Sequence, residues 1–220
     1  MREKRDLTWT QELAYVVGLI ATDGCLSGDG RHILFTSKNI DLIKTFAGIL
    51  NLENKIGIAR NPSSWAHRIQ FGDVQLYRWL MKIGLTPNKS LTMGALAIPP
   101  EFFIDFLRGH LDGDGSITTY TDRYNTFKNP KYVYDRVFVR FISASEKHIT
   151  WLHKMVITLT RIRCAKHTAK PKPETGRSMY ILKFGKKASL ELMRKMYYSK
   201  DVPALERKRA IAYKLMKKYP

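Results

Sequence analysis

Hydrophobic residues recur along this chain with two periodicities, one typical of helices and one that alternates as in strands. In the first part, turn residues separate three segments of helical spacing from three strand-like segments. The helical segments lie at 8–21, 39–50 and 74–83, and the strand-like ones at 32–36, 55–60 and 66–71. The predicted order is therefore helix, hairpin, helix, hairpin, helix. We expect a capping box of Thr8 and Gln11 to start the first helix.

The second part of the chain repeats this order and adds a helix at the end. Helices are predicted at 101–111, 147–159, 188–196 and 204–218, and strands at 117–120, 137–141, 163–168 and 178–184. The first hairpin is long, and its connecting segment, 121–136, is rich in Tyr, Arg, Lys and Asn. Two similar halves, 1–95 and 96–220, of the α+β class are therefore predicted.

Each half contains a related nonapeptide, VVGLIATDG at 16–24 and LRGHLDGDG at 107–115. Each copy is an apolar helical run that contains Gly and ends in Asp-Gly. The last turn of a helix has exposed carbonyls and the negative end of the helix dipole, so an Asp there completes an oxygen-rich site that suits Mg²⁺. Asp23 and Asp114 are the predicted metal-binding acids.

Small residues in the two nonapeptides predict close packing of their helices. Gly18 and Thr22, and likewise Gly109 and Gly113, lie four residues apart on one stripe. A single Asp-Gly after a helix is most often only a helix stop, but two copies in matching frames favour a paired site. The segment 112–116 also resembles the start of an EF-hand loop, but the later positions of that loop do not fit.

The charge of the chain indicates a polyanionic partner. Its 38 Lys and Arg residues outnumber 19 Asp and Glu residues, for a net charge of +19, and nucleic acid is the commonest partner of such proteins. Residues 1–95 carry +4 and residues 96–220 carry +15, so we expect a firmer grip on phosphate from the second half.

The remaining composition indicates an intracellular protein that is not secreted. Cys25 and Cys164 are far apart and form neither a zinc pattern nor a disulfide framework. The N-terminus has no apolar signal core, and no apolar run is long enough to cross a membrane. Whether the compartment is an organelle or a prokaryotic cytoplasm stays open.

Two lysines and eight strand or turn residues are further candidates for the chemistry. Lys89 and Lys208 lie late in their halves, where a Lys near a metal-bound phosphate can stabilise developing charge, although each alone is typical of a solvated surface. Two-stranded ribbons fit the major groove, where Arg and Gln read bases and Lys more often meets phosphate. The candidate DNA-contacting residues are Arg31, Arg68, Gln70, Tyr120, Arg136, Arg140, Lys166 and Lys183.

In its two nonapeptides, 91 residues apart, and in its element order, the chain resembles the single-chain, two-repeat LAGLIDADG homing endonucleases. The resemblance implies a saddle of two αββαββα halves, with the nonapeptide helices at their interface and the sheets astride double-stranded DNA. It implies that Asp23 and Asp114 bind two or three Mg²⁺ ions with help from the carbonyls of Thr22 and Gly113, and that Mn²⁺ or Ca²⁺ can substitute in binding.

The resemblance also implies a reaction and an oligomeric state. Each half would cut one DNA strand across the minor groove and leave short 3′ overhangs, with Lys89 and Lys208 near the cleavage centre, and the single chain would act as a monomer. Two alternatives on the same scaffold remain open, a non-cleaving DNA-binding regulator and an intron RNA maturase. The sequence departs from the family pattern at Arg108 and His110, which are polar for a nonapeptide helix, and at Ala21, where the second copy has Asp112.

Overall fold

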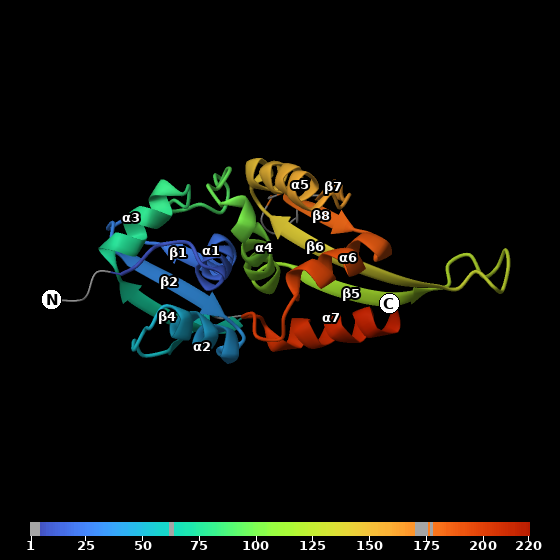
Figure 1. Cartoon of the computed structure of the whole chain (residues 1–220), viewed down its shortest axis with the longest axis horizontal. Coiled ribbons are helices and arrows are strands. Elements are labelled where there is room, and N and C mark those ends of the chain that lie inside the picture. The colour runs from blue at the N-terminus through green and yellow to red at the C-terminus, as the bar shows by residue number, and fades with distance from the viewer. Residues whose placement is uncertain (1–4, 62–63, 170–175, 177) are drawn as a thin grey trace.

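The computed structural model describes residues 5–61, 64–169, 176 and 178–220, and its first half contains one antiparallel sheet (Figure 1). The elements are α1 (Gln11–Asp23), β1 (Gly24–Leu26), β2 (His32–Ser37), α2 (Ile40–Ile49), β3 (Gly57–Asn61), β4 (Ser64–Gly72) and α3 (Val74–Lys82). The strand order is β1-β2-β4-β3, and every neighbouring pair is antiparallel.

The second half repeats this topology. Its elements are the 3₁₀ turn η1 (Pro100–Phe102), α4 (Phe103–Asp112), β5 (Ser116–Asp122), β6 (Tyr134–Ser143), α5 (Glu146–Thr160), β7 (Ala165–Ala169), β8 (Met179–Phe184), α6 (Lys186–Met196) and α7 (Glu206–Lys218). The sheet order β5-β6-β8-β7 corresponds strand by strand to that of the first half. The predicted α+β fold of two similar halves is confirmed, while the division at residue 95 stays a prediction.

The first helix begins later than the sequence predicted. Thr10, not Thr8, caps α1, because its side chain accepts a hydrogen bond from the Leu13 N–H at 3.1 Å. The backbone N–H of Thr8 instead donates to Asp6 Oδ1 at 2.8 Å. The helix also extends two residues further than predicted, so that Asp23 is its last residue.

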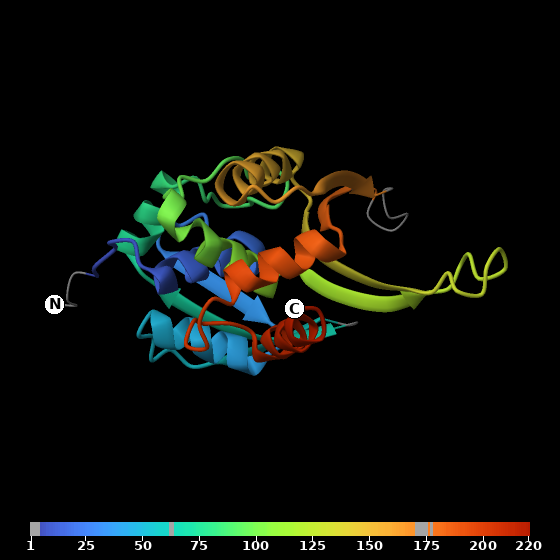
Figure 2. The same cartoon turned by 45° about the vertical axis from the view of Figure 1, so that its right-hand side comes forward.

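Helices α1 and α4 pack side by side between the two sheets (Figures 1 and 2). Their closest approach is at two glycines. A Cβ atom on Gly18 would lie 2.2 Å from the Phe106 carbonyl oxygen, and one on Gly109 would lie 2.0 Å from the Tyr15 carbonyl oxygen. The predicted stripe of small residues therefore lets the two backbones touch.

Each sheet has one face buried against helices and one face that we call the open face. Ile69 and Phe71 of β4, and Val139 and Phe141 of β6, are buried on the helix side. The residues between them point to the open face, because successive side chains of a strand alternate. Among the described helices, none has the length and apolar character needed to cross a membrane.

Candidate active site

The C-terminal ends of α1 and α4 meet and bring two acids close together. Asp23 ends α1, and Asp114 follows α4 by two residues. A Cβ atom on Gly113 would lie 1.9 Å from Thr22 Oγ1 and 3.3 Å from Asp23 Oδ2. The structure therefore places Asp23, Thr22, Gly113 and Asp114, all predicted as one site, at a single junction.

The two carboxylates share a partly desolvated environment. Burial, followed by the negative charge of Asp114, raises the pKa of Asp23 to about 7. Burial also raises the pKa of Asp114, while the positive charges of Lys89 and Lys208 oppose the shift. Two acids that resist ionisation beside each other form a site that a divalent cation would stabilise.

The donor set fits a hard cation. In the part of the chain that the structure describes, no group of three or more His, Cys, Asp or Glu side chains could hold a metal ion. An ion at this junction would therefore depend on Asp23, Asp114, the carbonyls beside them, water and substrate oxygens. Mg²⁺ uses few protein carboxylates in this way and keeps several waters.

Each half contributes one buried lysine to its own helix end. Lys89 Nζ donates to the Gly24 carbonyl, and Lys208 Nζ donates to the Gly115 carbonyl at 2.8 Å, so both lysines contact the ninth residue of their nonapeptide. Lys208 also donates to the carbonyls of Leu111 at 2.5 Å and Asp112 at 3.0 Å. The two predicted lysines are thus buried and symmetry-related, not solvated.

Burial changes the acidity of both lysines. It lowers the pKa of Lys89, while the charges of Cys25, Asp114 and Asp23 oppose the shift. It lowers the pKa of Lys208 to about 8, with the Asp112 charge as the largest opposing effect. Lys208 therefore remains mostly an ammonium at neutral pH and places positive charge beside the acids.

The number of carbonyl partners predicts different consequences for the two lysines. Lys208→Met should lower the free energy of unfolding by about 2–4 kcal/mol, because several buried carbonyls lose their donor. Lys89→Met removes the donor of one carbonyl, so we expect a loss of about 1–2 kcal/mol. Urea denaturation of both variants measures the difference. An equal loss of unfolding free energy in the two variants would contradict the larger number of carbonyl hydrogen bonds made by Lys208.

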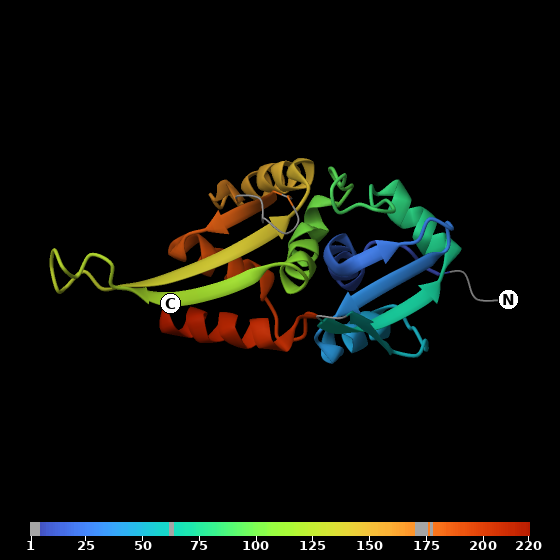
Figure 3. The ribbon, with the colours of Figure 1, turned by 180° about the vertical axis from the view of Figure 1, so that it is seen from behind.

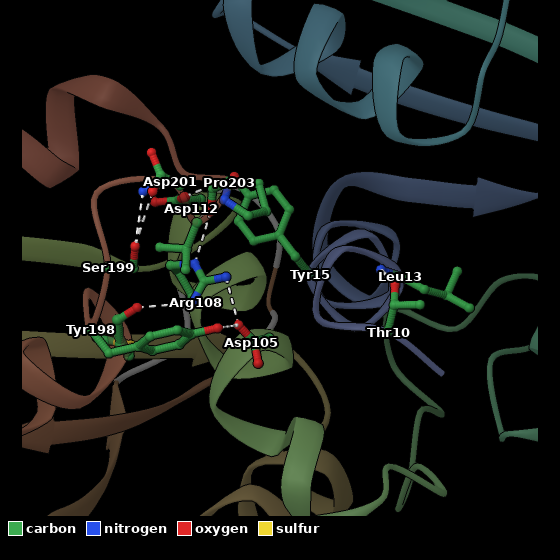
Figure 4. A network of polar contacts seen from close by, with 12 residues as sticks. Thr10, Leu13, Tyr15, Asp105, Arg108, Asp112, Tyr198, Ser199, Asp201 and Pro203 are labelled. Carbon is green, nitrogen blue, oxygen red and sulfur yellow. Dashed lines mark hydrogen bonds and ion pairs between the residues drawn. The ribbon is translucent and has the colours of Figure 1, made fainter. Parts of the chain in front are cut away.

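Asp112, the extra acid of the second nonapeptide, connects this helix end to α7. Its Oδ2 accepts hydrogen bonds from Tyr15 Oη at 2.9 Å and from the Leu205 N–H at 2.6 Å (Figure 4). Leu205 directly precedes α7, so the carboxylate faces the N-terminus of the helix that carries Lys208. Burial raises the pKa of Asp112 to about 6, and this acid is absent from the predicted site.

Arg108 makes a second buried connection from α4. Its Nη2 donates to Asp105 Oδ1 at 2.7 Å, and its Nε and Nη1 donate to the carbonyls of Pro203 and Met196 at 2.8 Å each. Tyr198 Oη also donates to Asp105 Oδ1, at 2.9 Å (Figure 4). The polar residue in the nonapeptide helix therefore holds the connection between α6 and α7.

His110 makes a third buried contact, with His148 of α5. Their Nε2 atoms lie 3.1 Å apart, and His148 Nδ1 lies 3.0 Å from the Gly94 carbonyl oxygen. A carbonyl only accepts, so Nδ1 of His148 is protonated, its Nε2 accepts, and His110 Nε2 donates. Burial lowers the pKa of His110 to about 3 and that of His148 to about 4, so both rings are neutral at physiological pH.

Most of the predicted DNA-contacting residues lie on the open faces. Arg68 and Gln70 are exposed on β4, and Arg31 is exposed just before β2. In the second half, Tyr120 is opposite Arg136, and Arg140 is opposite Lys183. All four point away from the buried Val139 and Phe141, as their alternation along the strands requires. Their contacts with DNA stay predictions.

Lys166 lies on the helix side of its sheet, and Arg31 lies outside β2, so neither is a strand residue of the open face. Lys166 is opposite the buried Leu182 in the β7–β8 register. Its Nζ donates to Thr150 Oγ1 at 3.1 Å and lies 3.8 Å from Glu146 Oε1, both on α5. Lys166 does not share the open face with Lys183, so the prediction that it contacts DNA held on that face is wrong.

Phe138 also lies on the open face, although it is not among the DNA-contacting residues predicted from the sequence. Lys183 Nζ lies 4.0 Å from its ring centroid, and Arg140 Cζ lies 5.3 Å from it. Its position between the two predicted residues Arg136 and Arg140, in an alternating strand, was the signal that could have identified it.

The sequence matches no protein-family model and no curated protein, but its fold matches several solved structures. A mesophilic variant of the homing endonuclease I-DmoI has 15% identity and a TM-score of 0.55, with 92% of this chain and 97% of that chain covered. I-WcaI, a homing endonuclease bound to its DNA recognition sequence, has 13% identity and a TM-score of 0.62, with 93% and 88% covered.

A third structure is full-length DUF199/WhiA from Thermatoga maritima, with 15% identity and a TM-score of 0.57. The match covers 98% of this chain but 63% of the WhiA chain, whose N-terminal part is a LAGLIDADG domain. I-DmoI has also been solved in complex with DNA and Ca, and with DNA and Mn. The resemblance seen in the two nonapeptides is thus confirmed in three dimensions: the chain has the fold of the single-chain LAGLIDADG homing endonucleases.

Proposed function

We propose that this protein is a site-specific endonuclease that cuts both strands of DNA with the help of divalent metal ions. The observation that carries the proposal is the junction of α1 and α4, where Asp23 and Asp114 lie together and each half adds a buried lysine. Burial raises the pKa of both carboxyl groups, and the charge of Asp114 raises the pKa of Asp23 further, although Lys89 and Lys208 oppose both shifts. Ionisation of such buried acids lowers the stability of the protein, and residues with strongly shifted pKa values cluster at functional sites.

The residues of the junction would have different roles in phosphodiester hydrolysis. Asp23 and Asp114, with the carbonyls of Thr22 and Gly113, would hold the cations. When bound, Mg²⁺ activates water and neutralises charge that develops on the phosphate. Lys89 and Lys208 add fixed positive charge beside the reacting groups. Mn²⁺ and Ca²⁺, which occur in structures of I-DmoI with DNA, would bind to the same oxygen ligands.

The pairing of acids also accounts for cutting both strands. Across the minor groove, which is about 6 Å wide, the two scissile phosphates come close enough for one junction to serve both. One acid from each half would then act on one strand each and leave short 3′ overhangs. Because one chain supplies both halves, the protein would act as a monomer on double-stranded DNA.

The open faces of the sheets would hold the DNA. Arg31, Arg68 and Gln70 in the first half and Tyr120, Arg136, Arg140 and Lys183 in the second are the residues proposed to contact it. Since the halves carry +4 and +15, the target would be asymmetric and the second half would bind more firmly.

A non-cleaving regulator is the second candidate, because the same fold occurs in DUF199/WhiA and not only in proteins named as endonucleases. An intron RNA maturase is the other alternative on this scaffold. Both acids and both lysines are present at the junction, which favours cleavage over either alternative.

A cleavage-selected library tests the proposed function. Randomised duplexes incubated with Mg²⁺ should yield one asymmetric site with staggered ends, and the same library with EDTA should yield none. Binding should weaken by at least about 100-fold between low and moderate salt, because phosphate contacts release counterions. Salt-sensitive binding without cleavage in Mg²⁺ or Mn²⁺ would favour the regulator, preference for intron RNA would favour the maturase, and binding insensitive to salt would exclude a nucleic-acid role.

A further inference from the structure

The outer part of the β5–β6 hairpin, residues 121–136, extends far beyond the rest of its half. All three views show this yellow-green ribbon and its tip projecting from the end remote from the N-terminus (Figures 1, 2 and 3). Two large apolar side chains at the tip are solvent-exposed, Tyr124 by 82% and Phe127 by 75%. Aromatic rings that add nothing to the core, on a segment this prominent, indicate an interaction surface.

The exposed rings of the tip are arranged in pairs with cations beside them. The rings of Tyr124 and Phe127 are perpendicular, with centroids 6.5 Å apart. Lys128 Nζ lies 5.5 Å from the centroid of Phe127. Tyr132 and Tyr134 stack with centroids 6.3 Å apart. Rings interleaved with cations are typical of proteins that stack on nucleobases and contact the adjacent phosphates.

The acids of the hairpin do not cancel this positive charge, because both are paired at its base. Asp122 Oδ2 lies 2.9 Å from the Arg136 guanidinium. Asp135 Oδ2 accepts from Tyr219 Oη at 2.6 Å and from Lys218 Nζ at 2.9 Å. The tip itself carries three cations, Arg123, Lys128 and Lys131, which form no ion pair with any described residue.

The same alternation continues along β6 toward the active site. On its open face, Arg136 Cζ lies 5.5 Å from the Tyr134 ring, and Lys183 and Arg140 both lie next to the Phe138 ring. Strand β5 begins two residues after Asp114 and pairs with β6 along its whole length. Its seven residues span about 23 Å, so the tip lies well beyond the acids at the junction.

We propose that this tip is a second DNA-binding site, which stacks Tyr124 and Phe127 on unpaired or unstacked bases next to the segment held by the sheets. The surrounding cations would contact the phosphates of the same stretch. Continuity with the open face favours DNA over an anionic membrane, which aromatic and basic residues also fit. The inference rests on the proposed function for its ligand class but assigns a contact outside the cleavage site.

Fluorescence anisotropy with a labelled oligothymidine and a labelled blunt duplex tests this site. The variant Y124A/F127A should bind the oligothymidine about 5- to 150-fold more weakly, since one stacked base is worth that much, while duplex affinity changes less than about 3-fold. The swap Y124F/F127Y keeps both rings and should bind like the wild type. W65A, which removes an exposed ring from the other half, should also leave oligothymidine affinity unchanged.

The salt dependence of binding should be the same in Y124A/F127A as in the wild type, because no cation is removed. Unchanged oligothymidine affinity, or an equal loss on both DNAs, would overturn the stacking site. Loss of binding to anionic phosphatidylserine vesicles with intact oligothymidine affinity would assign the tip to a membrane instead. A wild-type protein that binds neither DNA would refute the proposed function. If the wild type binds the duplex, the proposed function stands, and the oligothymidine measurements alone decide whether the tip is a stacking site.

Discussion

Replacing Asp23 by Asn should reduce Mg²⁺-dependent cleavage by at least about 1,000-fold and leave the affinity for DNA nearly unchanged. The amide has the shape of the carboxylate but lacks the charge that would hold the cation. Single-turnover cleavage of the selected target and anisotropy in the presence of EDTA measure the two effects. Glu53→Gln removes one exposed carboxylate from the same half and should change neither.

The same substitution should make the protein more stable at neutral pH. The pKa of Asp23 is about 7 in the folded protein and 3.8 in the reference state. Between these values the folded state keeps a proton that the unfolded state has released, so ionisation of Asp23 lowers stability as the pH rises from about 4 to about 7. Asn cannot ionise, and the Tm difference between variant and wild type should increase over this range and then level off.

Thermal unfolding in EDTA from pH 4 to pH 8 measures this difference, at about 2–4 °C for each kcal/mol in a chain of this size. Adding Mg²⁺ or Mn²⁺ should raise the Tm of the wild type and not that of Asp23→Asn, because the cation binds only the folded site. A variant that cuts normally would refute the metal assignment. A variant that is less stable at pH 7 would indicate a structural carboxylate.

The paired helices could be predicted because their determinants are local. Gly18 and Gly109 occupy the same place in two nonapeptides, and an acid ends each run, so one helical pattern read twice predicts contact and charge together. The order of helices and strands along the second half followed from the same repeat, whereas the three-residue strand β1 (Gly24–Leu26) was not predicted. The start of α1 was misplaced because Thr8 and Thr10 are both good capping residues, and only the folded backbone distinguishes them.

The environment of the polar residues could not be predicted, because their partners are distant in sequence. Arg108 donates to the carbonyls of Met196 and Pro203, more than 85 residues away. Lys208 reaches Gly115 across 93 residues. Every residue has a backbone carbonyl, so the sequence does not distinguish a lysine that donates to buried carbonyls from a lysine on the solvated surface.

The face of a strand residue depends on register, which the sequence also leaves open. Lys166 and Lys183 both belong to strands of one hairpin, and each is basic. Because Ala165 is opposite Lys183, Lys166 lies on the other face. A shift of one residue would have reversed this outcome.

Gly109→Ala should lower the free energy of unfolding by about 3 kcal/mol or more, although Ala in a helix normally stabilises by up to about 1 kcal/mol. Its Cβ atom would lie 2.0 Å from the Tyr15 carbonyl oxygen and 3.2 Å from Gly18 Cα, all backbone atoms that move only with the whole of α1. Gly48→Ala is the matched control, because its Cβ atom in α2 would meet no atom within 4 Å. That variant should be as stable as the wild type or slightly more so.

Urea denaturation measures both variants, and cleavage measures what the helix contact contributes beyond stability. If α1 and α4 separate to admit the methyl group, Asp23 and Asp114 at their ends move apart. Gly109→Ala should then cut slowly even at temperatures where circular dichroism shows it folded, whereas Gly48→Ala should cut normally. Wild-type stability for Gly109→Ala would mean that the helices are not in backbone contact, and a folded variant with full activity would mean that their spacing does not position the acids.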